Sequence, residues 1–81
     1  MKKSNKIVDI VGWIGVIEIL VAYALLNFNI FNAQNLIYQI LNLTGSCAIL
    51  FEAYKKKDYE PVILNLVWAI IAIIVILRII F

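Results

Sequence analysis

Five polar side chains stand inside otherwise apolar stretches of the sequence, and they are the residues most able to do chemistry. Amide and hydroxyl groups donate and accept hydrogen bonds, an indole offers a ring for stacking, and a carboxyl group can carry a proton or bind a cation. We interpret them as the candidate binding site for a small polar solute, because polar groups are costly in an apolar setting. The five residues are Glu18, Asn42, Ser46, Asn65 and Trp68.

Each of these residues also has a purely structural explanation. Asn42, Ser46 and Asn65 are equally suited to hydrogen-bond a neighbouring helix, a contact worth roughly 1 kcal/mol in a membrane. Trp68 suits helix packing as well as stacking on a ligand ring, and Glu18 suits a satisfied structural carboxyl as well as a proton, cation or substrate site. The pattern leaves both interpretations open for all five.

The composition indicates that the setting of these residues is lipid. The 81 residues are 65% hydrophobic, with a mean hydropathy of +1.03, whereas a soluble domain is nearer half apolar. The net charge of +2 is too small to suggest a nucleic acid partner. The chain has no histidine and one cysteine, Cys47, which argues against an intrachain disulfide, a Cys/His zinc site and a histidine-based triad. We therefore expect no enzyme activity, no metal and no cofactor.

Three stretches are long and apolar enough to cross a bilayer as helices. They cover residues 7–26, 35–54 and 61–81; the last is about 30 Å long at the rise of an α-helix, close to the thickness of the hydrocarbon core. Pro61 suits the first turn of a helix, where its missing N–H has no intrahelical partner. The predicted fold is all-α, a single integral membrane domain of three helices.

The lysines predict the orientation of the three spans. Residues 1–6 and 55–60 each hold three lysines, and residues 27–34 hold no Lys or Arg. Positive loops stay in the cytoplasm, so we expect the N-terminus inside, the C-terminus outside and a multi-pass protein in the cell (inner) membrane. We expect Asp9 to meet Lys6 or the lysines of the second loop, and Glu52 to lie close to Lys55 and Lys56.

Helical spacing places small and polar residues on shared faces, which should point at protein or water. Glu18 and Asn42 each come out about 16–18 Å from the inner end of their span, near the midplane. We expect the face of the third span to lie against the other two spans. The faces hold Gly15, Glu18 and Ala22 in the first span, Asn35, Gln39, Asn42, Ser46, Ile49 and Ala53 in the second, and Asn65, Ala69, Ala72 and Ile76 in the third.

The order of Asn42 and Gly45, a basic turn at residues 55–58, then Asn65 and Trp68 resembles a family of small bacterial integral membrane domains, the CBU-like proteins. More distantly, it resembles the three-helix half-unit of the PQ-loop superfamily, which includes the SemiSWEET sugar transporters. That resemblance implies a homodimer in which Asn65 of each protomer contacts substrate, and helices in the spatial order one-three-two. The first span lacks the proline–glutamine motif, and the tryptophan lies on the third span instead of the second.

The sequence thus predicts a homodimeric, transporter-like protein for a small polar solute. The alternative is a non-transporting small subunit or assembly partner of a larger membrane protein. A holin-like lesion former is disfavoured by the compact loops and the specific polar faces.

Overall fold

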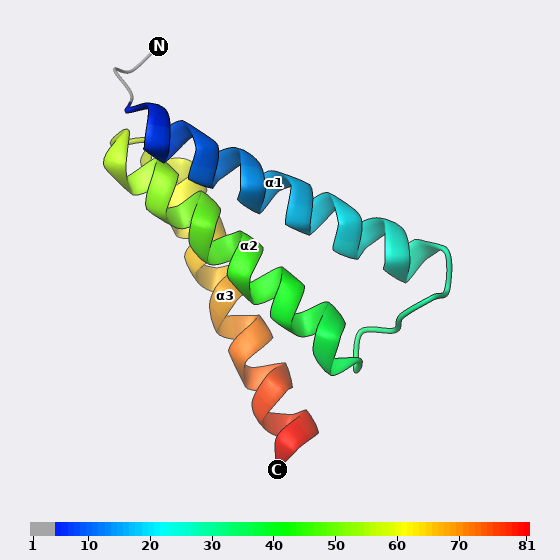
Figure 1. The fold of residues 1–81 in the computed structure, drawn as a ribbon. Helices are drawn as coiled ribbons and strands as arrows, with labels where there is room; N and C mark the ends of the chain where they lie inside the picture. The colour runs from blue at the N-terminus through cyan, green and yellow to red at the C-terminus, as the bar shows by residue number, and fades with distance from the viewer. Residues whose placement is uncertain (1–4) are drawn as a thin grey trace.

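The computed structural model describes residues 5–81, and these residues fold into three α-helices (Figure 1). Helix α1 spans Lys6–Asn27, α2 spans Leu36–Lys55 and α3 spans Tyr59–Ile80, within two residues of the predicted bounds at every end. All three are long and apolar enough to cross a membrane. The all-α, three-helix prediction is confirmed, whereas Lys2 and Lys3, two of the lysines behind the predicted orientation, lie outside the described residues.

Asparagines cap the first two helices, as their short polar side chains favour. The side chain of Asn5 accepts a hydrogen bond from the backbone N–H of Ile7 at 2.7 Å, and that of Asn35 accepts one from Tyr38 at 3.1 Å. Lys57, in the turn between α2 and α3, has a φ of 58°, which lets the chain reverse within a few residues. Pro61 lies in the first turn of α3, as predicted.

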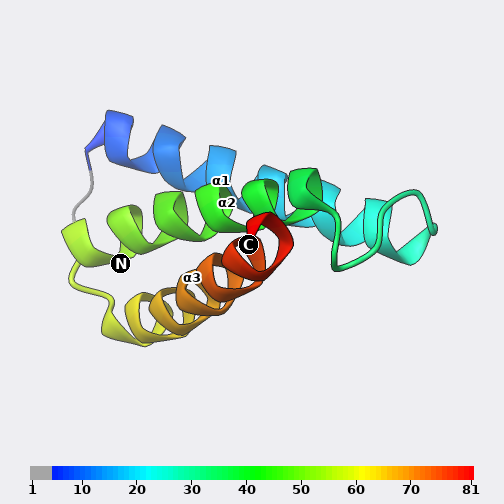
Figure 2. The ribbon, with the colours of Figure 1, turned by 90° about the horizontal axis from the view of Figure 1, so that it is seen from below.

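Helix α2 lies between the other two helices (Figure 2). It packs against both α1 and α3, while α1 and α3 make no contact with each other. The expected order, with the third span in the middle and touching the other two, is therefore wrong. The physical reason is that α2 has two small or polar faces, one for each neighbour, whereas α1 and α3 have one each.

The buried residues are almost all small. Apart from Gln39, every buried residue of the three helices is Gly, Ala or Ser. The large apolar side chains point outward, for example Trp13 and Ile63. This arrangement inverts that of a soluble domain and is typical of helices that pack through close backbone approach and turn their bulky residues to lipid.

Helices α1 and α2 approach each other closely at Gly15 and Gly45. A Cβ atom added to Gly15 would lie 2.7 Å from the carbonyl oxygen of Gly45 and 2.9 Å from Cβ of Ala48. A Cβ atom on Gly45 would lie 2.9 Å from Cγ1 of Ile19. Both glycines are therefore required by the space between the helices.

Candidate functional site

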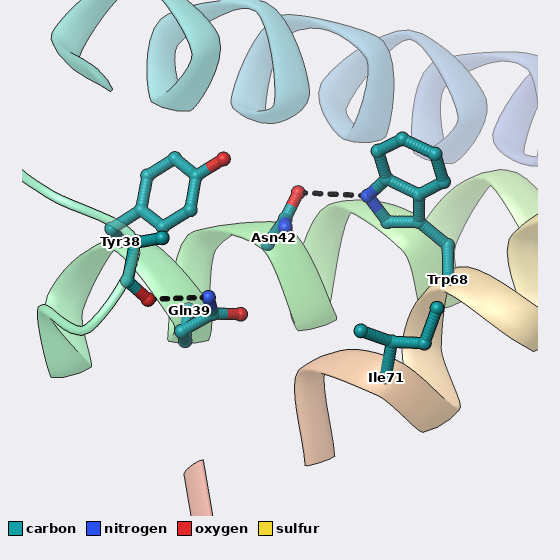
Figure 3. Close-up of a pocket in the computed structure, with 6 residues that line it drawn as sticks. Tyr38, Gln39, Asn42, Trp68 and Ile71 are labelled. Carbon is teal, nitrogen blue, oxygen red and sulfur yellow. Dashed lines mark hydrogen bonds between the residues drawn. The ribbon is translucent and has the colours of Figure 1, made fainter. Parts of the chain in front are cut away.

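Trp68 and Asn42, which the sequence places 26 residues apart, meet across the interface of α2 and α3. The indole Nε1 of Trp68 donates to Oδ1 of Asn42 at 3.1 Å (Figure 3). An indole nitrogen only donates, so the oxygen of the Asn42 amide must face it. The contact fixes which way the Asn42 side chain is turned, and its Nδ2 is left pointing elsewhere.

A hollow of about 180 Å³ opens beside this contact. We call it the α2–α3 hollow. Tyr38 and Trp68 stand on either side of Asn42, with Gln39 and Ile71 nearby (Figure 3). Among residues 5–81, no charged side chain lines it. The lining residues are Ala33, Tyr38, Gln39, Asn42, Trp68 and Ile71.

Gln39 is the polar residue most deeply placed in the wall of the hollow. Only 5% of its surface is exposed, and its Nε2 donates to the carbonyl oxygen of Ala33 at 2.6 Å. Its Oε1 is buried and has no hydrogen-bond partner within the described part of the chain, although buried polar atoms are nearly always paired. The sequence put Gln39 on the polar face of the second span but not in the site; its place one turn before Asn42 was the available signal.

Ser46 and Asn65 lie outside the hollow. Ser46 is fully buried, one turn beyond Asn42, and its Oγ has no hydrogen-bond partner among residues 5–81. The side chain of Asn65 donates to the carbonyl oxygen of Pro61 in its own helix at 2.9 Å, a local bond to the preceding turn. The bond from Asn65 to a neighbouring helix that the sequence suggested is therefore not formed.

Glu18 lies at the other interface of α2, where α1 packs. Its Oε2 is 3.1 Å from Oγ1 of Thr44, and the same hydroxyl is 3.0 Å from the carbonyl oxygen of Ile40. The structure thus divides the five predicted residues between the two sides of α2. Thr44 was not among them, although counting residues from the inner ends of the two spans puts it at the depth of Glu18.

The charged end of the molecule holds the start of α1 and the turn between α2 and α3. Here Nζ of Lys56 lies 2.6 Å from Oδ1 of Asp9 and 3.0 Å from Oε2 of Glu52, which confirms the predicted pairing of these carboxylates with lysines. We call these three residues the ion cluster. The hydrogen bonds from Lys56 to Asp9 and then to Glu52 raise the pKa of Lys56 above its ordinary value of 10.5.

A second hollow, of about 320 Å³, lies beside the ion cluster. It is lined by Gly12, Trp13, Val16, Glu52 and Lys56. Gly12 makes room for Glu52, because a Cβ atom there would lie 2.5 Å and 2.6 Å from the two carboxylate oxygens. Since Lys56 is held between two carboxylates, it is not available to attract an anion into this hollow.

The comparison with known proteins places the chain in a family without giving it a function. No curated protein matches the chain, and no solved structure matches it. A family model matches residues 8–81, which includes all three helices except the first two residues of α1. The chain therefore belongs to that family, an uncharacterised family of bacterial proteins.

Proposed function

We propose that this protein is a transporter-like membrane protein that acts as a homodimer on a small polar solute, with the α2–α3 hollow as its solute site. The observation that carries the proposal is the buried Oε1 of Gln39, which has no hydrogen-bond partner in the described residues and belongs to a side chain that lines a hollow beside Asn42 and Trp68. A buried acceptor without a partner is costly, and a bound solute or ordered water would satisfy it.

The lysine pattern supports an orientation with the N-terminus and the charged end in the cytoplasm. In that orientation the α2–α3 hollow opens in the outer half of an inner membrane. The proposal does not rest on the likeness to the PQ-loop superfamily, because α2 and not α3 occupies the middle of the unit.

A second copy is part of the proposal because one copy encloses no path. Helices α1 and α3 do not contact each other, and few residues in each span are buried. Two copies would surround the hollows with protein. Light scattering or native mass spectrometry in detergent should give the mass of a dimer.

Uptake into liposomes tests the proposed transport. Purified protein is reconstituted, and entry of a panel of small polar solutes is compared with empty vesicles. We expect uptake of at least one solute, and loss of that uptake in Asn42→Ala. Asn65→Ala is the matched control, because Asn65 lies at the same interface but bonds only within its own helix. Equal leak in protein-containing and empty vesicles would exclude transport of the panel, and equal loss in both variants would exclude the hollow as the site.

The same open arrangement supports a second candidate function, that of a small subunit docked on a larger membrane protein. The faces of α1 and α3 that do not meet each other would then be covered by that protein instead of by a second copy. A monomeric mass in detergent, together with no uptake, would favour this function over transport.

A further inference from the structure

We infer that the α2–α3 hollow is built for an uncharged group that carries both a hydrogen-bond donor and an acceptor, and that a small carboxamide or ureido compound fits it. This inference rests on the proposed solute site and names its ligand class. It follows from the way in which two amide side chains are turned, from the surfaces beside them, and from the absence of charge in the lining.

The first amide is that of Asn42. Trp68 donates to its Oδ1, so Nδ2 is the group left for a ligand, and within the described part of the chain it makes no hydrogen bond. The hollow therefore presents a donor at this position. Because Trp68 can only donate, the amide cannot turn over without losing the contact.

The second amide is that of Gln39. The carbonyl oxygen of Ala33 can only accept, so the nitrogen of Gln39 must face it, as the 2.6 Å contact shows. Oε1 consequently points away from Ala33, toward the space beside Ile71 (Figure 3). The hollow therefore presents an acceptor here, one turn along α2 from the donor of Asn42, a separation of about 5–6 Å between the Cβ atoms.

A donor and an acceptor held in fixed directions select a ligand with the complementary pair. A primary carboxamide supplies a carbonyl oxygen for Nδ2 of Asn42 and an N–H for Oε1 of Gln39. A carboxylate has no N–H, and an ammonium group has no acceptor. Each would also carry its charge into a hollow whose described lining residues include no charged side chain, and such a transfer out of water is costly.

The size and the remaining walls agree with a small molecule. At about 180 Å³, the hollow is large enough for several waters or for a compound of a few heavy atoms. The rings of Tyr38 and Trp68 and the side chain of Ile71 provide apolar surface for a short carbon chain.

Fluorescence of Trp68 provides a direct binding test. Trp13→Phe removes the other tryptophan, which lies on α1 outside this hollow, and leaves Trp68 as the single reporter. This protein is titrated in detergent with butyramide, butyrate and butylammonium, which have nearly the same size. We expect a saturable change in emission with butyramide, and no saturable change with the two ions at the same concentrations. An equal response to all three compounds, or no response to any, would overturn the inference.

Two variants in the same background locate the contacts. Gln39→Leu removes the acceptor, and Asn42→Asp keeps an oxygen for Trp68 but replaces the donor. Each should weaken butyramide binding about 10-fold or more, as expected when a buried polar group loses its partner. Gln34→Leu, a change in the exposed loop, should have no effect. Circular dichroism confirms that each variant is helical, and unchanged affinity in a folded Gln39→Leu would overturn the assignment.

The outcome can be separated from that of the transport proposal. Specific butyramide binding without uptake into liposomes would leave the ligand class standing and remove transport. Uptake of a charged solute that depends on Asn42, without butyramide binding, would support transport and overturn the ligand class.

Discussion

The indole Nε1 of Trp68 lies 3.1 Å from Oδ1 of Asn42. Within residues 5–81 this is the one hydrogen bond that joins side chains of α2 and α3. The buried residues that α3 contributes, Ala69 and Ala72, are small and have no polar side-chain group to make a directional contact. The Trp68–Asn42 bond therefore sets the register of α3 on α2 as well as the direction of the Asn42 amide.

Removing the indole N–H of Trp68, while keeping an aromatic ring at this position, should weaken the packing of α3 against α2. Trp68→Phe leaves Oδ1 of Asn42 without its donor, and we expect a loss of about 1 kcal/mol in the free energy of unfolding, the usual size of such a bond in a membrane protein. Unfolding in mixed micelles, followed by circular dichroism, measures it. Trp13→Phe, at an exposed position, is the control and should change little. Equal stability in both variants would mean that the bond contributes nothing to the packing.

The sequence was sufficient for the three helices and for their buried faces. Apolar length defines the spans, and the spacing of small residues identified Ala69 and Ala72 as contact residues, which the structure buries. Helix order could not be obtained in the same way. A small-residue face shows that a helix has a neighbour, but it does not identify the neighbour, and in lipid no hydrophobic force distinguishes one partner from another.

The candidate site was predicted in part for a related reason. Asn42 and Trp68 were both candidates from the sequence, and the structure brings them together, but residue type alone could not say whether Asn65 would bond across helices or to Pro61 in its own helix. Gln39 was recognised as part of the polar face, yet its role depends on the Ala33 carbonyl in the loop. A loop conformation of this kind does not follow from helical periodicity.

A methyl group at Gly15 should separate α1 from α2. In Gly15→Ala the new Cβ would meet the backbone oxygen of Gly45 at 2.7 Å, and backbone cannot turn aside as a side chain can. We expect a loss of about 1–3 kcal/mol, the cost of overpacking. Gly45→Ala should cost less, because its nearest atom belongs to the Ile19 side chain, at 2.9 Å, and the backbone oxygen of Gly15 lies farther away, at 3.0 Å.

The control for this pair is Cys47→Ala, at an exposed position of α2, which should leave stability unchanged. The same unfolding assay in mixed micelles gives the free energy of unfolding of all three variants, which can then be ranked. If Gly15→Ala were as stable as the unchanged protein, α1 and α2 could not approach each other as closely as described at Gly15.

The ion pairs of the ion cluster should persist in mildly alkaline solution. Because Asp9 and Glu52 raise the pKa of Lys56 above 10.5, the stabilisation from its charge is fully present below that value and is lost only as the pH rises through the higher pKa of the folded protein. The titration of Lys56 should therefore not change the melting temperature between about pH 7 and pH 10.

Lys56→Met leaves the two carboxylates facing each other and should lower the melting temperature by a few degrees at neutral pH. Lys55→Met is the control, because Lys55 is exposed and lies over the ring of Phe51. Melting curves recorded across the alkaline range should show the Lys56-dependent difference shrinking only at the highest pH. A difference that disappears near pH 8 would contradict the raised pKa of Lys56.

The hydroxyl of Thr44 should matter for the packing of α1 and not for solute. Thr44→Val keeps the shape of the side chain and removes the donor that lies 3.1 Å from Glu18, so we expect a loss of about 1 kcal/mol in the free energy of unfolding. Thr44→Ser keeps the hydroxyl and should behave as the unchanged protein. Butyramide binding, measured through Trp68, should be the same in both, because the Glu18–Thr44 contact lies on the side of α2 that faces α1. A folded Thr44→Val protein that no longer binds butyramide would show that the two interfaces of α2 form one site, as the sequence first suggested for Glu18.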